Sequence, residues 1–378
     1  MAELVLDSLE IKGFRAFDQL TVERLGRVNL IVGKNNVGKT ALLEAVRMYA
    51  RQDLLERITD AAHLRATEAA EETTEGGPVW GNLTDAELRT QYETFRHLFH
   101  GHPSARDLPV EFKIGPMGQS EGVLCVGFAE KKSGKVGAVG PHFRIQIGGE
   151  REASEKKRYY YLKQGANGAP SDSSPALFVP HDGLGEQEAR RMWNDVFLEG
   201  KKEVVVEALR TVEPNVQDVD WVSAPQMRLS FHGAEALADL SETGKRLPFV
   251  EVESQKRPLP LESMGEGMSR LLSIGIALAN AEDGLLLVDE IENGLHYSTQ
   301  PDLWRLIFET AARLNVQVFA ATHSMDCIRA FQHAADEHPN EGMLVSLRRK
   351  REAKEEIVAV LADEADLETV VSTGIEVR

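Results

Sequence analysis

The chain has few cysteines and few aromatic residues. Only two of its 378 residues are cysteines, Cys125 and Cys327, and they lie far apart in no spacing typical of metal ligands. This argues against a disulfide framework and against a zinc site, and it predicts a protein of a reducing compartment. Aromatic residues make up 6% of the chain, but a hydrophobic content of 42% still supplies a core.

Long apolar runs are also missing. No run reaches the length of a transmembrane helix. The first residues, Met1-Ala2-Glu3-Leu4, lack the basic and then apolar layout of a signal peptide. We therefore expect a cytoplasmic protein that has no membrane partner.

Positive charge is scarce, because the formal net charge is −17. A protein that grips nucleic acid usually presents a basic face, since neutralised phosphates release counterions and supply non-specific affinity. Nucleic acid is therefore disfavoured as a partner. Two short basic runs, 348–351 and 156–158, are interpreted as solvated surface, although a local basic groove remains the alternative.

The segment Gly33–Thr40, GKNNVGKT, matches the P-loop pattern at every fixed position. A short apolar strand is predicted before it at 28–32, and a helix with apolar residues at helical spacing is predicted after it at 41–50. Two glycines let backbone N–H groups wrap a phosphate, and the helix dipole favours the same anion. Lys39 is expected on the β and γ phosphates and Thr40 on Mg²⁺. The alternative is an ordinary glycine turn with a solvated lysine.

A second cluster follows an apolar strand at 285–288, which ends in Asp289 and Glu290. This pattern is typical of a buried parallel strand that delivers acids to the edge of a sheet. Asp289 is expected to hold Mg²⁺, and Glu290 to orient or deprotonate the attacking water. The alternative is a surface turn.

Two further segments suit a nucleotide site. A buried strand at 316–322 ends at His323, where a γ-phosphate sensor is expected, although a histidine after a strand is more often structural. Ser263 and Gly265 precede a helix that runs to about Ala281, and they would form a second anion cradle. Because one subunit already holds its phosphate at the P-loop, this cradle would close on the nucleotide of a neighbouring subunit. The alternative is a simple helix cap.

The rest of the chain predicts alternating short strands and helices. Strands are expected at 4–6 and 9–11, with a turn at Lys12-Gly13, and 51–105 is mostly polar with a helical pattern and an exposed loop at 68–78. An antiparallel sheet is expected from five short runs, at 110–114, 123–128, 143–147, 159–162 and 176–179. One or two helices are expected over 185–211, and short strands return over 216–252. No coiled-coil arm and no internal repeat is predicted.

Together these motifs resemble the ATP-binding-cassette (ABC) class of ATPases, in the branch of the SMC, RecF and OLD (overcoming lysogenization defect) proteins. The resemblance rests on the opening LEIKGFRAF at 9–17 and on NLIVGKNN at 29–36. The segment DEIENGLH at 289–296 is closer to the OLD-type ATPases than to SMC proteins. Both ends of the chain are covered, whereas 51–250 is matched only loosely.

The resemblance implies a role for each matching residue. Glu290, Lys39 and His323 would be catalytic, and Thr40 and Asp289 would bind Mg²⁺. The ATP-binding residues would be Arg15, Gly33, Asn35, Asn36, Val37, Gly38, Lys39, Thr40, Ala41, Ser263 and Gly265, with Arg15 near the α-phosphate or ribose. Residues 293–296 would form a D-loop, and Gln164 would be the glutamine of the Q-loop. The run Ser263-Met264-Gly265-Glu266 departs from the usual Ser-Gly-Gly-Gln/Glu signature.

The implied fold is α/β, an ABC-type P-loop ATPase head with a mixed sheet, an antiparallel β subdomain and a helical subdomain. We expect a single domain over 1–378 that is built from both ends of the chain. Lobe I covers about 1–180, and the helical or inserted region covers about 51–105 and 181–250. Lobe II covers about 251–345, and 346–378 forms a tail.

The implied function is an Mg²⁺-dependent ATPase that associates with itself around ATP and regulates a separate effector. OLD nucleases carry a Toprim domain after the ATPase, and this chain ends about 55 residues after His323. We therefore expect a stand-alone OLD-type ATPase, similar to that of PARIS-like anti-phage systems, with a Toprim-type nuclease as partner. The alternatives are a RecF- or SMC-like ATPase that clamps DNA in repair or recombination, and a nucleotide-holding oligomer with little turnover.

Overall fold

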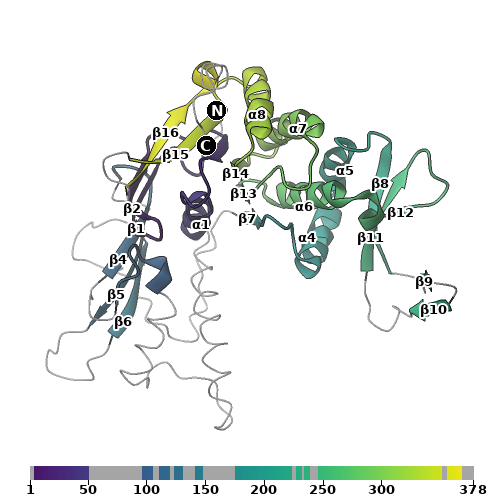
Figure 1. Ribbon diagram of the computed structural model, residues 1–378, viewed down its shortest axis with the longest axis horizontal. Coiled ribbons are helices and arrows are strands. Elements are labelled where there is room, and N and C mark those ends of the chain that lie inside the picture. The colour runs from purple at the N-terminus through teal and green to yellow at the C-terminus, as the bar shows by residue number, and fades with distance from the viewer. Residues whose placement is uncertain are drawn as a thin grey trace, which may run out of the picture.

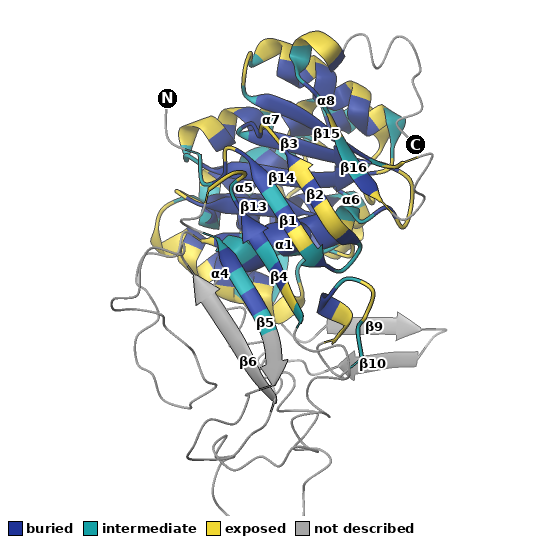
Figure 2. Ribbon diagram, turned by 90° about the vertical axis from the view of Figure 1, so that its left-hand side faces the viewer, coloured by how far each residue is buried: buried dark blue, intermediate teal, exposed yellow. Residues whose placement is uncertain are grey.

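A computed structural model describes ten stretches of the chain, which form two large sheets and a group of helices (Figure 1). The described residues are 4–50, 96–104, 110–119, 123–130, 141–147, 175–223, 227–231, 234–238, 246–350 and 356–367. Figure 2 shows buried residues concentrated along the central strands, while exposed residues gather on the outer helices.

A six-stranded mixed sheet forms the centre of the molecule. Its strands lie in the order β16-β15-β3-β14-β13-β7, and all neighbours are parallel except β15 and β16. The bounds are β16 Ile357–Ala362, β15 Gly342–Arg349, β3 Val28–Val32, β14 Gln317–Thr322, β13 Leu285–Val288 and β7 Ala176–Val179. Every residue of β3, β13 and β14 is buried, as expected of parallel strands that are covered on both faces.

The helix α1 (Lys39–Ala50) packs between this sheet and a second, antiparallel sheet. The second sheet has the order β2-β1-β4-β5-β6, with bounds β1 Leu9–Phe14, β2 Phe17–Val22, β4 Val110–Gly115, β5 Leu124–Glu130 and β6 Pro141–Ile147. The short helix η2 (Arg96–Leu98) adds Leu98 to the same core. Ile31 of β3 and Leu43 of α1 are fully buried in this cluster together with Phe14 and Phe112. The P-loop helix is therefore enclosed between two sheets.

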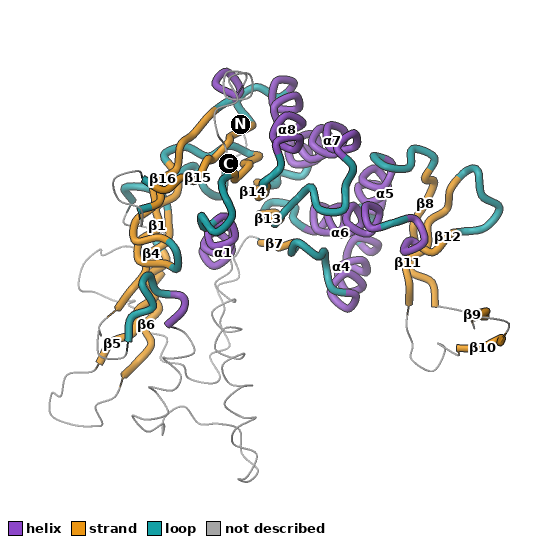
Figure 3. Tube along the Cα trace, in the orientation of Figure 1, coloured by secondary structure: helices purple, strands orange, loops and turns teal. Residues whose placement is uncertain are grey.

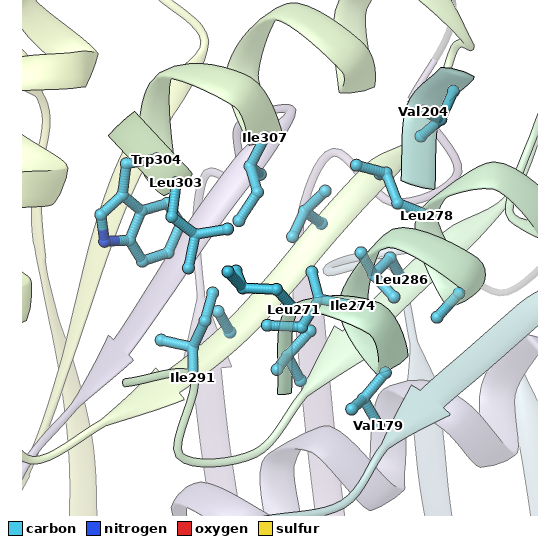
Figure 4. Close-up of a cluster of buried hydrophobic side chains, with 14 of the residues drawn as sticks. Val179, Val204, Leu271, Ile274, Leu278, Leu286, Ile291, Leu303, Trp304 and Ile307 are labelled. Atoms are coloured by element: carbon cyan, nitrogen blue, oxygen red, sulfur yellow. The ribbon is translucent and has the colours of Figure 1, made fainter. Parts of the chain in front are cut away.

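Helices lie on the opposite side of the mixed sheet from α1, as Figure 3 shows. They are α4 Glu186–Leu198, α5 Lys202–Arg210, α6 Glu266–Asn280, α7 Gln300–Arg313 and α8 Met325–Glu337. The helices α4 and α5 pack on α6. In Figure 4, Leu271, Ile274 and Leu278 of α6 lie against Leu286 of β13 and Val179 of β7. Because eleven of the fifteen residues of α6 are buried, this helix is a core element.

Beyond α4 and α5 lie two small antiparallel sheets. One has the order β12-β11-β8, from Leu259–Pro260, Arg246–Val252 and Val216–Ser223, and the other pairs β9 (Met227–Phe231) with β10 (Ala234–Ala238). Two short helices, η4 (Leu261–Met264) and η5 (Tyr297–Thr299), precede α6 and α7. The predicted α/β class, with a mixed sheet, antiparallel sheets and a helical part, is confirmed.

The predicted strand at Leu4–Leu6 is wrong, because this segment is bound by a side chain and not by a strand. The Leu6 N–H donates to Gln317 Oε1 at 3.0 Å, and Gln317 Nε2 donates to the Leu6 carbonyl at 2.7 Å and to the Gly26 carbonyl at 2.9 Å. A buried amide therefore takes the backbone groups that a neighbouring strand would have paired.

Two other local predictions are corrected. The predicted turn at Lys12-Gly13 lies within β1, and the chain turns instead at Arg15-Ala16, so that Phe14 pairs with Phe17. The predicted strand at 176–179 exists as β7 but does not belong to the antiparallel sheet. It pairs in parallel with β13, with Val179 opposite Val288. A four-residue apolar strand carries no local signal of its partner, so this pairing depended on contacts more than 100 positions away.

Several predicted segments lie outside the described residues. They are the helical pattern and loop over 51–95, the strand at 159–162, the basic run at 156–158 and Gln164. The predicted helices at 185–211 and the strands at 216–252 are confirmed where the structure describes them. Among the described residues, no helix is both long enough and apolar enough to cross a membrane.

Candidate functional site

The P-loop connects the end of β3 to the first turn of α1. Gly38 has a φ of +100°, and a Cβ there would lie 2.8 Å from Phe17 Cζ; at Gly33, with a φ of +149°, it would lie 2.6 Å from the Leu347 carbonyl oxygen. Asn36 has a φ of +64°. Only glycine meets both the backbone angle and the crowding at the first two positions, so the loop keeps the shape of an anion cradle.

Lys39 is folded back onto its own loop. Its Nζ donates to the Gly33 carbonyl at 2.8 Å and to the Lys34 carbonyl at 3.3 Å. Partial burial lowers the pKa of Lys39, while the carboxylates of Asp289, Glu290 and Glu292 oppose this shift. A partly desolvated ammonium that is held by carbonyl oxygens is well prepared to bind a phosphate.

Thr40 and Asp289 meet although they lie 249 positions apart. The Thr40 hydroxyl donates to Asp289 Oδ2 at 2.9 Å, and Asp289 is buried at the end of β13. One hydroxyl and one carboxylate oxygen, combined with phosphate oxygens and waters, are ligands that suit Mg²⁺. The donor set present here therefore fits the expected ion.

Glu290 and His323 lie at neighbouring strand ends. Nδ1 of His323 is 3.9 Å from Glu290 Oε1 and 3.4 Å from Glu292 Oε1, and the His323 backbone N–H donates to Glu292 Oε1 at 3.3 Å. Glu290 itself adopts a φ of +47°, which is unusual for a side chain of this size. The side chains of Glu290 and His323 are 41% and 52% exposed, so both remain open to a substrate.

Arg15 lies in the turn between β1 and β2, beside the P-loop. Its Nη1 is 2.5 Å from Glu44 Oε2 on α1, and its guanidinium lies 5.9 Å from the centre of the Phe14 ring. Burial raises the pKa of Glu44, and the nearby Arg15 opposes that shift. The structure thus gives Arg15 a partner on the P-loop helix, and its contact with a nucleotide stays a prediction.

Ser263 and Gly265 are exposed and lie on the opposite side of the mixed sheet from α1. The Ser263 hydroxyl donates to the Pro260 carbonyl at 2.6 Å, and Gly265 stands at the N-cap of α6 with a φ of +97° and no side chain to offer. The Ser263 side chain therefore does not cap α6, whereas Gly265 is the N-cap residue itself, and the alternative of a simple helix cap stays open. The structure brings Lys39, Thr40, Asp289, Glu290 and His323 to one edge of the mixed sheet.

The other predicted P-loop residues take supporting positions. Val37 and Ala41 are buried under the loop, whereas Asn35 and Asn36 are exposed at its tip. The Asn36 carbonyl accepts a hydrogen bond from Arg349 Nη2 at 3.1 Å. The basic run that begins at Arg348 therefore lies partly beside the P-loop, and not only on open surface.

Two further residues of this region, Arg270 and Glu292, have no role in the motifs read from the sequence. Arg270 donates to backbone carbonyls at the ends of β7 and β13, and Glu292 accepts from the His323 backbone. Asn293, in the predicted D-loop, joins the same two strand ends, because its Nδ2 donates to the His181 carbonyl at 2.8 Å. A signal for Arg270 was available, since it is the one charged residue in the largely apolar segment 267–279.

Two family models match the chain, one over each part of this site. The model described as "AAA ATPase domain" matches residues 5–77, which include the P-loop. The model described as "AAA domain, putative AbiEii toxin, Type IV TA system" matches residues 209–327, which include Asp289, Glu290 and His323.

The chain is a P-loop ATPase with AAA-type matches over residues 5–77 and 209–327. Its curated relatives include two uncharacterized proteins of Methanocaldococcus jannaschii. MJECL11 is 33% identical over 89 residues, 24% of the ATPase and 78% of that protein, so the two belong to one family. MJECL10 is 38% identical over 47 residues, 12% of the ATPase, which spans about a fifth (22%) of that relative's length. An "ATP/GTP phosphatase" of Helicobacter pylori is 22% identical over 352 residues, 86% of each chain.

Among solved structures, the ATPase is similar to an SMC head bound to the C-winged helix domain of ScpA. The identity is 13%, the match covers 95% of the ATPase and 97% of that chain, and the TM-score is 0.49. The SMC head domain from Thermotoga maritima gives 12% identity, 95% and 99% coverage and a TM-score of 0.44.

Proposed function

We propose that this ATPase hydrolyses ATP with Mg²⁺, associates with itself around the nucleotide and thereby regulates a separate effector protein. The observation that carries the hydrolytic part is the 2.9 Å hydrogen bond between Thr40 and Asp289. It places the P-loop helix and the acid-bearing end of β13 at one edge of the sheet, where Glu290 is the next residue.

Each residue at this edge has a distinct role in the proposal. The N–H groups of the glycine loop and Lys39 neutralise the phosphates, and Thr40 with Asp289 would hold Mg²⁺, which would offset charge on the transferred phosphoryl group. Glu290 orients the attacking water and accepts its proton, because its carboxylate is exposed at the strand end. His323, within 3.9 Å of Glu290, senses the γ-phosphate.

Self-association is supported by the exposure of the signature residues. Ser263 and Gly265 are exposed at the N-terminus of α6, and no side chain makes a capping hydrogen bond to the start of this helix. In a second copy of the chain they would reach the γ-phosphate held by the first. ATP binding would then assemble the composite site, and hydrolysis would reset it.

A separate effector is supported by charge and by the matched family model. The net charge of −17 suits a protein partner better than bare DNA. The description of the model over 209–327 names a toxin of a Type IV TA system. We propose a Toprim-type nuclease as the effector, a cytoplasmic location and a role in anti-phage defence, as in stand-alone OLD-type ATPases of PARIS-like systems.

The test compares the wild type with two variants in phosphate-release and nucleotide-binding assays. We expect Lys39→Ala to lose ATP binding, because the loop loses the ammonium that neutralises the phosphates. We expect Glu290→Gln to bind ATP normally while turnover falls by about 10²-fold or more, as for loss of a general base. EDTA should abolish turnover of the wild type. If Glu290→Gln released phosphate at the wild-type rate, the assignment would be wrong.

A second candidate function is an ATP-driven DNA clamp of the RecF or SMC kind. It is favoured by the basic end of β15, where Arg349 contacts the P-loop and the neighbouring Lys350 is also exposed. This candidate predicts ATP-dependent binding of duplex DNA that weakens steeply with salt. A gel-shift series at low salt that shows no binding in ATP would exclude it.

The division of the chain into lobes is also a proposal. We propose one ATPase domain over 1–378, with lobe I over about 1–180 and lobe II over about 251–345. Limited proteolysis with and without ATP would test this division, since a single domain should be protected as one unit.

A further inference from the structure

Arg270 is a buried arginine in a helix that otherwise belongs to the core. It is 5% exposed, and its neighbours in α6 pack on β13 and β7, as Figure 4 shows for Leu271 and Ile274. Burial lowers the pKa of Arg270, and the carboxylates of Glu292 and Asp289 are the strongest opposing charges. A buried guanidinium is costly unless its donors are used, so its contacts require an explanation.

Its donors are directed at the backbone beyond the carboxyl ends of two strands. Nη2 donates to the Asp289 carbonyl at 2.6 Å and to the Glu290 carbonyl at 3.0 Å. Nη1 donates to the Pro180 carbonyl, directly after β7, and Nε is buried without a partner among the described residues. One planar group thus fixes three carbonyls beside the predicted metal ligand and base.

The Glu290 backbone requires such support. A φ of +47° at a glutamate stores strain, which persists only where the surrounding structure over-determines it. The Asn293 N–H donates to the Glu290 carbonyl at 2.9 Å, and Arg270 donates to the same oxygen. In a variant that lacks the guanidinium, the Glu290 carbonyl would keep the Asn293 N–H and lose the Arg270 donor.

The helix that carries Arg270 also carries the signature segment at its start. Gly265 immediately precedes α6, and Gly267 in its first turn lies against the turn after Glu290, where a Cβ would be 3.0 Å from the Gly294 carbonyl oxygen. The segment that is expected to contact a second copy and the backbone of Glu290 are therefore joined through one rigid, buried helix.

We propose that Arg270 is a positioning residue that fixes the Glu290 backbone to α6, so that docking of a second subunit at Ser263 and Gly265 is transmitted to the catalytic carboxylate. This inference rests on the proposed ATP hydrolysis and self-association. It adds an intramolecular connection that the predicted site residues do not contain, and the P-loop has no part in it.

The test uses Arg270→Lys and Arg270→Gln, with Arg305→Lys as a matched control. Lysine keeps the charge without the planar fork, and glutamine avoids an unpaired buried charge. Arg305 is an exposed arginine on α7 that pairs with Asp302 and Glu337. We expect both Arg270 variants to lose about 10²-fold in kcat, as for misplacement of a catalytic group. ATP affinity should stay within about threefold, and Arg305→Lys should behave as the wild type.

A further arm uses Arg270→Ala with added guanidinium ions at a sub-denaturing concentration, and methylammonium as a control. Guanidinium should restore part of kcat, because it can refill the fork, and methylammonium should not. A folded Arg270→Lys or Arg270→Gln with wild-type kcat would overturn the proposal. The proposal would also be overturned if kcat and ATP binding both fell in proportion to the fraction of protein that is folded. Glu290→Gln in the same assay separates a failure of the Arg270 proposal from a failure of the proposed ATP hydrolysis. Full activity of Glu290→Gln would refute the proposed function itself.

Discussion

At the scale of single residues, the site depends on close contacts between side-chain and backbone groups that are distant in the sequence. The Thr40 hydroxyl and the Asp289 carboxylate meet at 2.9 Å across 249 positions of sequence. The crowding at Gly38 comes from Ala16, in the turn that also carries Arg15, and from Phe17, the first residue of β2. The P-loop is therefore shaped by a neighbouring turn as well as by its own glycines.

Gly38→Ala should damage both stability and nucleotide binding. Its φ of +100° disfavours any side chain, and a Cβ would lie 2.8 Å from Phe17 Cζ. We expect a loss of about 1–3 kcal/mol in the free energy of unfolding, with much weaker ATP binding. Urea unfolding and titration with a fluorescent ATP analogue measure the two effects.

The matched control is Gly118→Ala, where φ is +67° and no atom of the described residues lies within 4 Å of a Cβ. This variant adds backbone strain without a clash, so it should cost stability and leave ATP affinity unchanged. Equal ATP affinity in Gly38→Ala and Gly118→Ala would contradict the interpretation of the loop.

The two cysteines should differ in reactivity. Burial raises the pKa of the Cys327 thiol to about 12, with Glu292 adding to the shift and hydrogen bonds to Thr322 and Trp304 opposing it. Because a raised pKa keeps the thiol protonated, its thiolate is scarce at any pH well below 12. Cys125 is partly exposed.

We therefore expect iodoacetamide at a pH of about 8, near the ordinary pKa of a thiol, to modify Cys125 well before Cys327 in the folded protein. Mass spectrometry of tryptic peptides assigns the modified residue. Both cysteines should react once the protein is unfolded in urea. Rapid alkylation of Cys327 in the folded state would show that this residue is not buried as described.

At the scale of elements, the mixed sheet places the chemistry at one edge. β3, β14 and β13 are parallel neighbours, so the P-loop, His323 and Asp289 all follow carboxyl ends on the same side. The opposite, amino-terminal edge is tied together by amides. Gln317 at the start of β14 binds the backbone of Leu6 and Gly26, and Asn29 Oδ1 accepts from the Gly26 N–H at 2.8 Å.

Gln317→Leu should destabilise this edge without touching the site. The substitution would leave the Leu6 N–H and the Leu6 and Gly26 carbonyls buried without their amide partners. Each such group costs about 1–3 kcal/mol, so we expect a clear fall in the urea midpoint. Gln19→Leu, on the exposed face of β2, should change the free energy of unfolding by no more than about 0.5 kcal/mol. Equal midpoints for the two variants would refute the role given to Gln317.

At the scale of the whole molecule, the signature residues and the P-loop lie on different sides of the mixed sheet. We expect Glu290→Gln in saturating ATP and Mg²⁺ to accumulate as an associated species, because the γ-phosphate persists. Sedimentation velocity with and without ATP measures this. Lys39→Ala is the control and should stay dispersed. A dispersed Glu290→Gln variant in saturating ATP would refute assembly around the nucleotide.

Much of the site could be predicted because its residues belong to short, continuous patterns. The P-loop, the acids after 285–288 and the histidine after 316–322 each follow an apolar strand, and the structure describes all three strands. Arg270 and Glu292 could not be assigned in the same way, because their significance lies in backbone carbonyls and a ring nitrogen that distant segments supply. β7 was assigned to the wrong sheet for a related reason.

The sequence by itself determined which local elements exist and which of them carry phosphate-binding and acidic groups, because glycine angles, apolar periodicity and strand-end acids are properties of neighbouring residues. Only the tertiary structure decided that Thr40 meets Asp289, that Gln317 replaces a strand at Leu6, and that Arg270 supports Glu290. These contacts join positions up to 311 residues apart. They form only when the sheets and helices pack, since no local pattern specifies which distant group each side chain will meet.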